Sequence, residues 1–177
     1  KNVNIDFSID GIEDTYEYIR YPMKWSIINK KIEMLENFLK KFNPKINVYV
    51  NFTVQTYNIL HMLEFIDYFL TKGFLPILHP VHHPPYLSIK NTPDSLKPIL
   101  LKKLENKIEE LSGKENDKVH LPWVCEKITA LINLIQVPSD PDEIKNFLKF
   151  TKALDGKRNQ NFELVSPEIS KHFLELV

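Results

Sequence analysis

The chain has 177 residues, of which 43% are apolar, and 23 basic side chains balance 23 acidic ones. Such a length and composition predict one globular domain with a sizeable core. The balanced charge excludes a general nucleic-acid footprint, and no apolar run approaches the ~20 residues that span a bilayer. We therefore expect a soluble, cytoplasmic protein without a membrane segment.

A single cysteine, Cys125, excludes an internal disulfide framework and any cluster held by several thiolates of this chain. Its helical surroundings favour core packing over a role as nucleophile. The chain begins at Lys1 without a methionine and soon enters a predicted strand. This start suggests a piece of a longer protein.

The opening residues, 3–11, alternate between apolar and polar side chains, which predicts a strand. A pleated strand places Ser8 and Asp10 on one face, which must meet water, a ligand or a functional cavity. Buried polar atoms without partners would cost roughly 1–3 kcal/mol each. Gly11 permits a sharp exit. The alternative is an edge strand with a solvated face.

Further strands and helices then alternate along the chain. In order they are a helix from Trp25 to a stop at Asn43-Pro44, a strand over 46–54, a helix from an Asn58 cap to Gly73, and a strand over 74–78. This order predicts right-handed βαβ units on a parallel sheet.

From Thr92 onward the pattern is helical. The predicted helices are one that Thr92 caps and Gly113 closes, one along Val124 to Ile135, one from Asp140-Pro141 to about Gly156, and a short one from Ser166-Pro167. We expect two parts, with β/α units over 1–92 and a helical extension over 93–177.

Polar residues gather where the three predicted strands end. They form three groups, Ser8, Asp10 and Arg20; Thr53, Gln55 and Asn58; and His79, His82 and His83. Because the carboxyl ends of parallel strands carry the site in βαβ folds, we expect one shared pocket mouth. The histidines fit substrate hydrogen bonding or proton transfer, a metal site, or an exposed proline-stiffened loop without a role.

Two familiar signatures are missing from the sequence. The four scattered glycines form no phosphate-binding loop, and no Gly-x-Ser-x-Gly elbow occurs. An unrelated doubly wound hydrolase is therefore disfavoured.

Four segments together resemble the radical S-adenosylmethionine (radical SAM) enzymes, in the branch that carries a twitch domain. They are residues 7–11 with 18–29, residues 50–55 with Asn58, residues 78–93, and the motif Phe-Thr-Lys-x-Leu-Asp-x-x-Arg-Asn-Gln-x-Phe over 150–162. The first three are similar to the family's fourth, fifth and sixth strands and their exits.

The resemblance implies the last three β/α units of a partial (β/α)6 TIM-like barrel. It also implies that the complete enzyme cleaves S-adenosylmethionine reductively with a 4Fe-4S cluster and abstracts hydrogen from an unidentified substrate, for which a peptide is one candidate. The family's Cys-x3-Cys-x2-Cys and Gly-Gly-Glu segments do not occur here. This chain alone would be inactive and would need its missing N-terminal half-barrel or a partner chain.

By position, the resemblance assigns roles to the strand-end residues. Those expected at the cofactor are Ser8, Asp10, Arg20, Thr53, Gln55 and Asn58, and those expected at the substrate are His79 and His83. The competing interpretation is a non-catalytic half-barrel that binds a partner, because an open sheet leaves edges that favour pairing.

Overall fold

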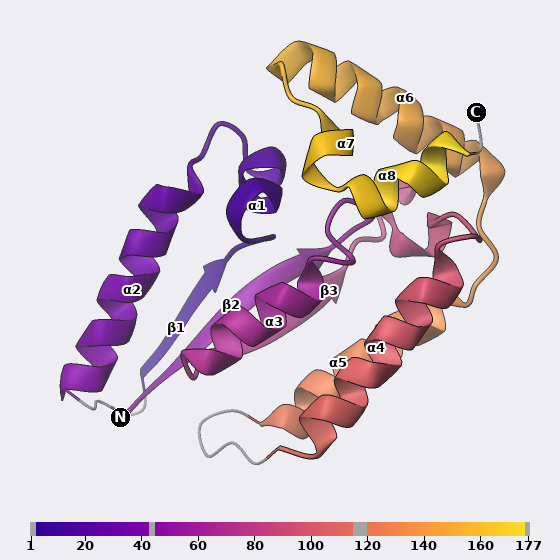
Figure 1. Ribbon diagram of the computed structural model, residues 1–177. Helices are drawn as coiled ribbons and strands as arrows, with labels where there is room; N and C mark the ends of the chain where they lie inside the picture. The colour runs from indigo at the N-terminus through magenta and orange to yellow at the C-terminus, as the bar shows by residue number, and fades with distance from the viewer. Residues whose placement is uncertain (1–2, 43–44, 115–119, 176–177) are drawn as a thin grey trace.

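The computed structural model describes residues 3–42, 45–114 and 120–175, and its centre is a three-stranded parallel sheet (Figure 1). The strands are β1 (Val3–Ser8), β2 (Ile46–Val54) and β3 (Leu75–Pro80), in the order β1-β2-β3. The predicted α/β class and parallel pairing are confirmed. Among the described residues, no helix combines the length and apolar character needed to cross a membrane.

Two helices connect the strands on one side of the sheet. They are α2 (Trp25–Phe42) and α3 (Met62–Thr71). They lie side by side, because Trp25 packs against Tyr68 with ring centroids 5.7 Å apart and Lys72 pairs with Glu36 at 2.7 Å. Sequential strand order with both helices on one side is a singly wound arrangement.

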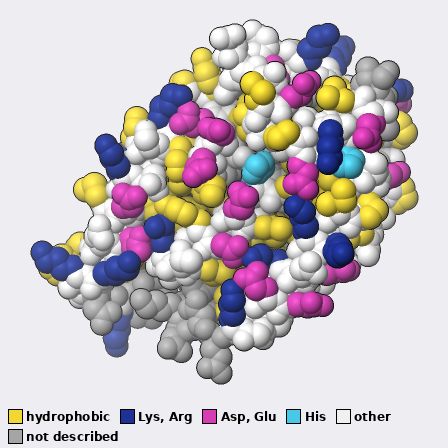
Figure 2. Space-filling view, viewed as in Figure 1, with side chains coloured by type: hydrophobic (Ala, Val, Ile, Leu, Met, Phe, Trp, Pro, Cys, Tyr) yellow, Lys and Arg dark blue, Asp and Glu magenta, His cyan; other side chains and the backbone are white. Residues whose placement is uncertain are grey.

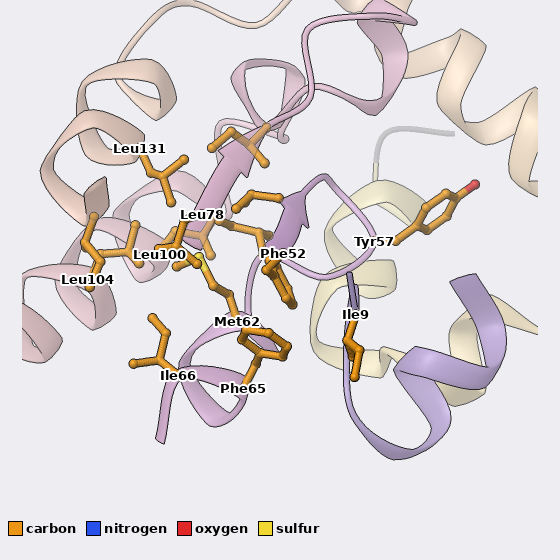
Figure 3. Packing of buried hydrophobic residues seen from close by; sticks show 14 of the residues in the cluster. Ile9, Phe52, Tyr57, Met62, Phe65, Ile66, Leu78, Leu100, Leu104 and Leu131 are labelled. Atoms are coloured by element: carbon orange, nitrogen blue, oxygen red, sulfur yellow. The ribbon is translucent and has the colours of Figure 1, made fainter. Parts of the chain in front are cut away.

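The covered face of the sheet carries the core (Figure 3). Val50, Phe52 and Val54 alternate along β2 and are fully buried, and the Phe52 ring lies 4.3 Å from that of Phe65 in α3. The opposite face of β2 carries Asn51 and Thr53, which are only partly buried. The predicted alternation along this strand is therefore confirmed, and helices of the described ranges cover its apolar face.

The C-terminal half is helical, as predicted. Its elements are the turns η1 (Pro85–Leu87) and η2 (Ile89–Asn91) and the helices α4 (Lys97–Ser112), α5 (Leu121–Ile135), α6 (Pro141–Arg158), α7 (Phe162–Val165) and α8 (Pro167–Leu174). α4 and α5 form a hairpin beside β3, and α6 to α8 lie beyond the carboxyl ends of the strands (Figure 1).

Three predicted helix boundaries were wrong. α4 begins at Lys97 instead of Pro93, because residues 93–96 form a turn closed by the Leu96 amide on the Pro93 carbonyl. α6 continues through Gly156 to Arg158, because Gly156 is exposed and the left-handed Asn159 (φ 53°) forms the cap. α3 begins at Met62, since the Asn58 side chain bonds elsewhere.

An unpredicted helix, α1 (Glu13–Ile19), follows β1. Gly11 permits it through close approach, because a Cβ there would lie 2.9 Å from Thr15 Cγ2. Gly73 has the left-handed φ of 73° expected just beyond α3. The predicted stop of α2, Asn43-Pro44, lies outside the described residues.

The motif at 150–162 joins the C-terminal helices to α1. Tyr18 donates its hydroxyl hydrogen to Asp155 Oδ1 at 2.8 Å, and Asp155 Oδ2 accepts the Phe162 amide at 3.0 Å. The hydroxyls of Tyr57 and Thr151 are 2.7 Å apart. We call Tyr18, Tyr57, Thr151, Asp155 and Phe162 the C-terminal clasp.

Aromatic packing completes the C-terminal clasp. The Phe162 ring lies 5.7 Å from that of Tyr18 and 5.0 Å from that of Tyr57, and Arg158 donates to the Tyr18 carbonyl at 3.3 Å. Burial raises the pKa of Tyr57 to about 12, and it raises the pKa of Tyr18 further. Both hydroxyls therefore stay protonated in the folded protein at neutral pH.

Asp155→Asn should lower the free energy of unfolding by about 1–3 kcal/mol, because the clasp loses its charge-assisted hydrogen bonds. Urea unfolding measures the change. Asp142→Asn, an exposed aspartate in the first turn of the same helix, is the control and should change stability by less than about 0.5 kcal/mol. Equal effects of the two variants would contradict the clasp.

The clasp should also make the fold sensitive to alkali. Since the pKa of Tyr57 is raised to about 12 from the unfolded value of about 10, its contribution is complete below pH 10 and is lost between pH 10 and 12. We expect urea midpoints to fall across this window. Tyr57→Phe should flatten the fall, whereas Tyr21→Phe, at an exposed tyrosine, should not.

Candidate functional site

Four polar side chains share the uncovered face of the sheet at the carboxyl ends of its strands. Register pairs Ser8 with Asn51 and Thr53 with His79, and partners in a parallel ladder project to the same face. A hydrogen bond of 3.1 Å joins His79 Nε2 to Asn51 Oδ1. Ser8 and His79 are exposed, so this row of hydroxyl, amide and imidazole groups is accessible to a ligand. We call these four residues the strand-end row.

Asp10 lies beside this row. Its side chain is buried, and both carboxylate oxygens have partners within the protein. Its Oδ1 accepts the Thr53 amide at 2.8 Å, and its Oδ2 pairs with Arg20 Nη2 at 2.6 Å. The carboxylate therefore ties the end of β1 to β2 and to the end of α1. Direct contact of Asp10 with a cofactor stays a prediction.

Asn58 connects the same two strand ends through its amide. Its Nδ2 donates to the carbonyls of Asp10 and Thr53, both at 2.9 Å, and its Oδ1 accepts the Gln55 amide at 2.9 Å. All three of these hydrogen bonds are made to backbone groups, and Asn58 is completely buried. In this fold Asn58 positions the strand-end row, and its predicted cofactor contact stays a prediction.

The guanidinium group of Arg20 is paired on one side and exposed to solvent on the other. One guanidinium nitrogen pairs with Asp10, yet 40% of the side chain is exposed. Its Nε is buried and has no hydrogen-bond partner among the described residues. The guanidinium therefore retains donors for an additional acceptor such as a carboxylate. Gln55 is buried, and its backbone amide donates to Asn58 Oδ1.

The three groups of polar residues predicted at the strand ends come together only in part. Asp10, Arg20, Thr53, Gln55 and Asn58 form one connected web. His79 joins the site as the penultimate residue of β3, which corrects its predicted place in the loop, because β3 continues to Pro80. His82 and His83 lie exposed in the loop that follows.

No group of three or more His, Cys, Asp or Glu side chains in the described ranges is placed to share a metal ion. A 4Fe-4S cluster requires several thiolates, and this chain has one cysteine, in α5. These residues do not fit that cluster. The strand-end row and Arg20 present hydroxyl, amide, imidazole and guanidinium groups, which suit a polar ligand that carries a carboxylate.

Asn51 is the site residue that sequence reasoning left out. Its place on the polar face of the second strand was visible in the alternation, but its contact with His79 depends on the register between β2 and β3. Comparison with known proteins adds no further residue. No protein-family model, curated protein or solved structure matches this chain.

Asn58→Ala should cost about 2–4 kcal/mol of stability, because two buried carbonyls and one amide lose their partner. Asn47→Ala is the matched control, at an exposed asparagine of β2 that bonds only to the exposed Asn4 side chain among the described residues, and it should cost less than about 0.5 kcal/mol. Urea unfolding compares them. An Asn58→Ala variant as stable as the control would contradict the positioning role.

Proposed function

We propose that this chain is the C-terminal part of a radical SAM enzyme of the twitch-domain branch. The single observation that carries the proposal is the strand-end row, a line of polar side chains on the uncovered face of a singly wound parallel sheet. In a β/α barrel this face is the interior, and sites lie at the carboxyl ends of the strands. The chain would then be the last three strands of a partial (β/α)6 barrel.

The motif at 150–162 supports the same proposal. Its Thr151, Asp155 and Phe162 belong to the C-terminal clasp, which attaches α6 and α7 beside the strand ends. The resemblance thus falls on residues that shape the surroundings of the site. The motif that resembles the family's closing pattern would then be the same segment that attaches α6 and α7 to the sheet.

The proposed roles follow from what each side chain offers. Ser8, Asn51 and Thr53 would bind the polar parts of S-adenosylmethionine, and Arg20 would hold a carboxylate with the donors that Asp10 leaves open. His79, near the end of β3, and His83, in the loop after β3, would face the substrate. When bound beside a reduced cluster, S-adenosylmethionine would supply the hydrogen-abstracting chemistry.

The cluster would have to come from outside this sequence, either from a remaining half-barrel of the same protein or from a partner chain. The fragment alone would be inactive. A peptide or a small molecule is the proposed substrate class, and a 4Fe-4S cluster with S-adenosylmethionine is the proposed cofactor set.

A non-catalytic binding half-barrel is the second candidate. A chain with one cysteine cannot hold a 4Fe-4S cluster by itself. If this chain acts alone, the binding half-barrel is therefore favoured. In that case the strand-end row would bind a ligand without cleaving it.

Cleavage of S-adenosylmethionine by the complete natural protein tests the proposal. Anaerobic protein with a reconstituted cluster and dithionite should release 5′-deoxyadenosine, which mass spectrometry quantifies. Ser8→Ala and Asn51→Ala should each raise the KM for S-adenosylmethionine about tenfold, as loss of a hydrogen bond predicts.

Ser26→Ala, an exposed serine in α2, is the matched control and should leave KM unchanged. Binding of S-adenosylmethionine without 5′-deoxyadenosine would favour the binding half-barrel. Cleavage with normal KM in both strand-end variants would remove the proposed site.

A further inference from the structure

The three histidines near the end of β3 differ in how their rings are held. His79 Nε2 lies 3.1 Å from Asn51 Oδ1, so this ring has a partner. His82 and His83 are exposed in the loop that follows, and their rings make no hydrogen bond or ion pair with the described residues. Of these three rings, that of His79 is the one that the described residues hold in a single direction.

The register of the sheet explains the direction of the His79 ring. His79 pairs with Thr53, whereas Asn51 pairs with Ile77, two residues earlier in β3. Residues two apart share a face of a sheet, and neighbouring strands are about 4.8 Å apart, so this diagonal contact is within reach. Asn51 lies on the central strand, which pairs on both sides. Nε2 of His79 therefore points back along the sheet toward a residue with a well-fixed backbone.

The contact with Asn51 determines which nitrogen of the His79 ring carries the hydrogen. A carboxamide oxygen only accepts hydrogen bonds, so Nε2 must be the donor, and in the neutral imidazole Nδ1 keeps its lone pair. His79 is exposed, and no described residue bonds to its Nδ1. Nδ1 of His79 is therefore an accessible hydrogen-bond acceptor.

Histidines elsewhere in the described ranges have acidic neighbours at this nitrogen. His61 Nδ1 lies 3.8 Å from Glu64 Oε2, and His172 Nδ1 lies 4.0 Å from Glu175 Oε2. Figure 2 shows the side of the molecule that α3 covers, where acidic side chains lie near the histidines in view. His79 forms no such pair with the described residues, so its Nδ1 is left for a ligand.

Nδ1 of His79 also differs in chemistry from the other groups at the strand ends. The hydroxyls of Ser8 and Thr53 can donate or accept, and the guanidinium of Arg20 only donates. The carboxylate oxygens of Asp10 are already bonded, one to the Thr53 amide and one to Arg20. A ligand atom beside Nδ1 must therefore carry a hydrogen. A site built to bind such a group discriminates against analogues that lack it, because its own polar atom is then left unpaired.

His79 and Arg20 lie on opposite sides of the candidate site. Arg20 pairs with Asp10 beyond the end of β1, His79 lies near the end of β3, and β2 runs between these two strands. Under the proposed function the carboxylate of S-adenosylmethionine binds at Arg20. Nδ1 of His79 would then meet the substrate.

We propose that His79 Nδ1 selects a substrate that presents an O–H or N–H group, and that Asn51 is the positioning residue that keeps this nitrogen free. The substrate group donates its hydrogen bond to Nδ1, while the Nε2 hydrogen stays bonded to Asn51. The distinction between substrate and cofactor rests on the proposed function, because it depends on where S-adenosylmethionine binds. The positioning of His79 by Asn51 does not depend on it.

Alkylation of the complete natural protein with iodoacetamide tests which nitrogen is free. The reagent modifies the nitrogen that has the lone pair, and peptide mapping against standards alkylated at Nδ1 or Nε2 identifies it. We expect Nδ1 of His79 to be modified at least about fivefold more than Nε2, as one hydrogen bond predicts. A ring that nothing holds is modified mainly at the less crowded Nε2, which makes His82 the control in the same sample.

Substitutions of Asn51 test the positioning role. Asn51→Ala should give His79 the pattern of His82, whereas Asn51→Asp, which keeps an acceptor oxygen, should retain modification at Nδ1. Asn47→Ala, at an exposed asparagine on the same face of β2, is the matched control and should change nothing. Nitrogen NMR of the histidine rings should report the same hydrogen positions. Modification of wild-type His79 mainly at Nε2, or an unchanged pattern in Asn51→Ala, would overturn the proposal.

S-adenosylmethionine separates this proposal from the proposed function. At saturation it should leave the modification of Nδ1 unchanged, and protection of Nδ1 would overturn the substrate role. Modification at Nδ1 without release of 5′-deoxyadenosine would sink the proposed function and leave the role of Asn51 intact. Release of 5′-deoxyadenosine by a protein whose His79 is modified at Nε2 would sink this inference alone.

Discussion

The Asn58 side chain joins the ends of β1 and β2, and the placement of the candidate site depends on that junction. Its amide bonds the Asp10 and Thr53 carbonyls, while the Asp10 carboxylate bonds the Thr53 amide and Arg20. The hydrogen-bonding groups of the buried Asn58 amide all bond to backbone groups, and satisfied buried groups of this kind are stabilising. Here the bonds hold Ser8 and Thr53 at neighbouring strand ends on the uncovered face.

A second set of buried polar contacts fixes what surrounds those ends. The C-terminal clasp links residues far apart in sequence, since Tyr18 and Asp155 are separated by 137 positions. It brings α6 and α7 against α1, and α1 follows directly from the strand that carries Ser8 and Asp10. The hydrogen-bonded web around Asn58 holds Asp10 and Arg20, and the clasp holds Tyr18, so both act on the same short segment, 10–20.

Local patterns predicted the sheet well, because alternation and helical periodicity are properties of neighbouring residues. The parallel order and the buried faces of β2 and α5 followed from them. The roles of Asn58 and Asp10 did not, because an asparagine before a helix looks the same whether it caps that helix or bonds a distant carbonyl. Helix α1 was not predicted because it too depends on contacts with residues distant in sequence. Its buried face, with Tyr16 and Tyr18, packs partly against rings of distant segments such as Tyr57 and Phe162.

Intact mass of the natural protein, with iron and sulfide analysis of the same anaerobic sample, decides whether this chain belongs to a radical SAM enzyme. The radical SAM account predicts about four irons and four sulfides per molecule, bound by sequence beyond these 177 residues or by a partner chain. A mass equal to that of this chain, without iron and without a copurifying partner, would contradict it.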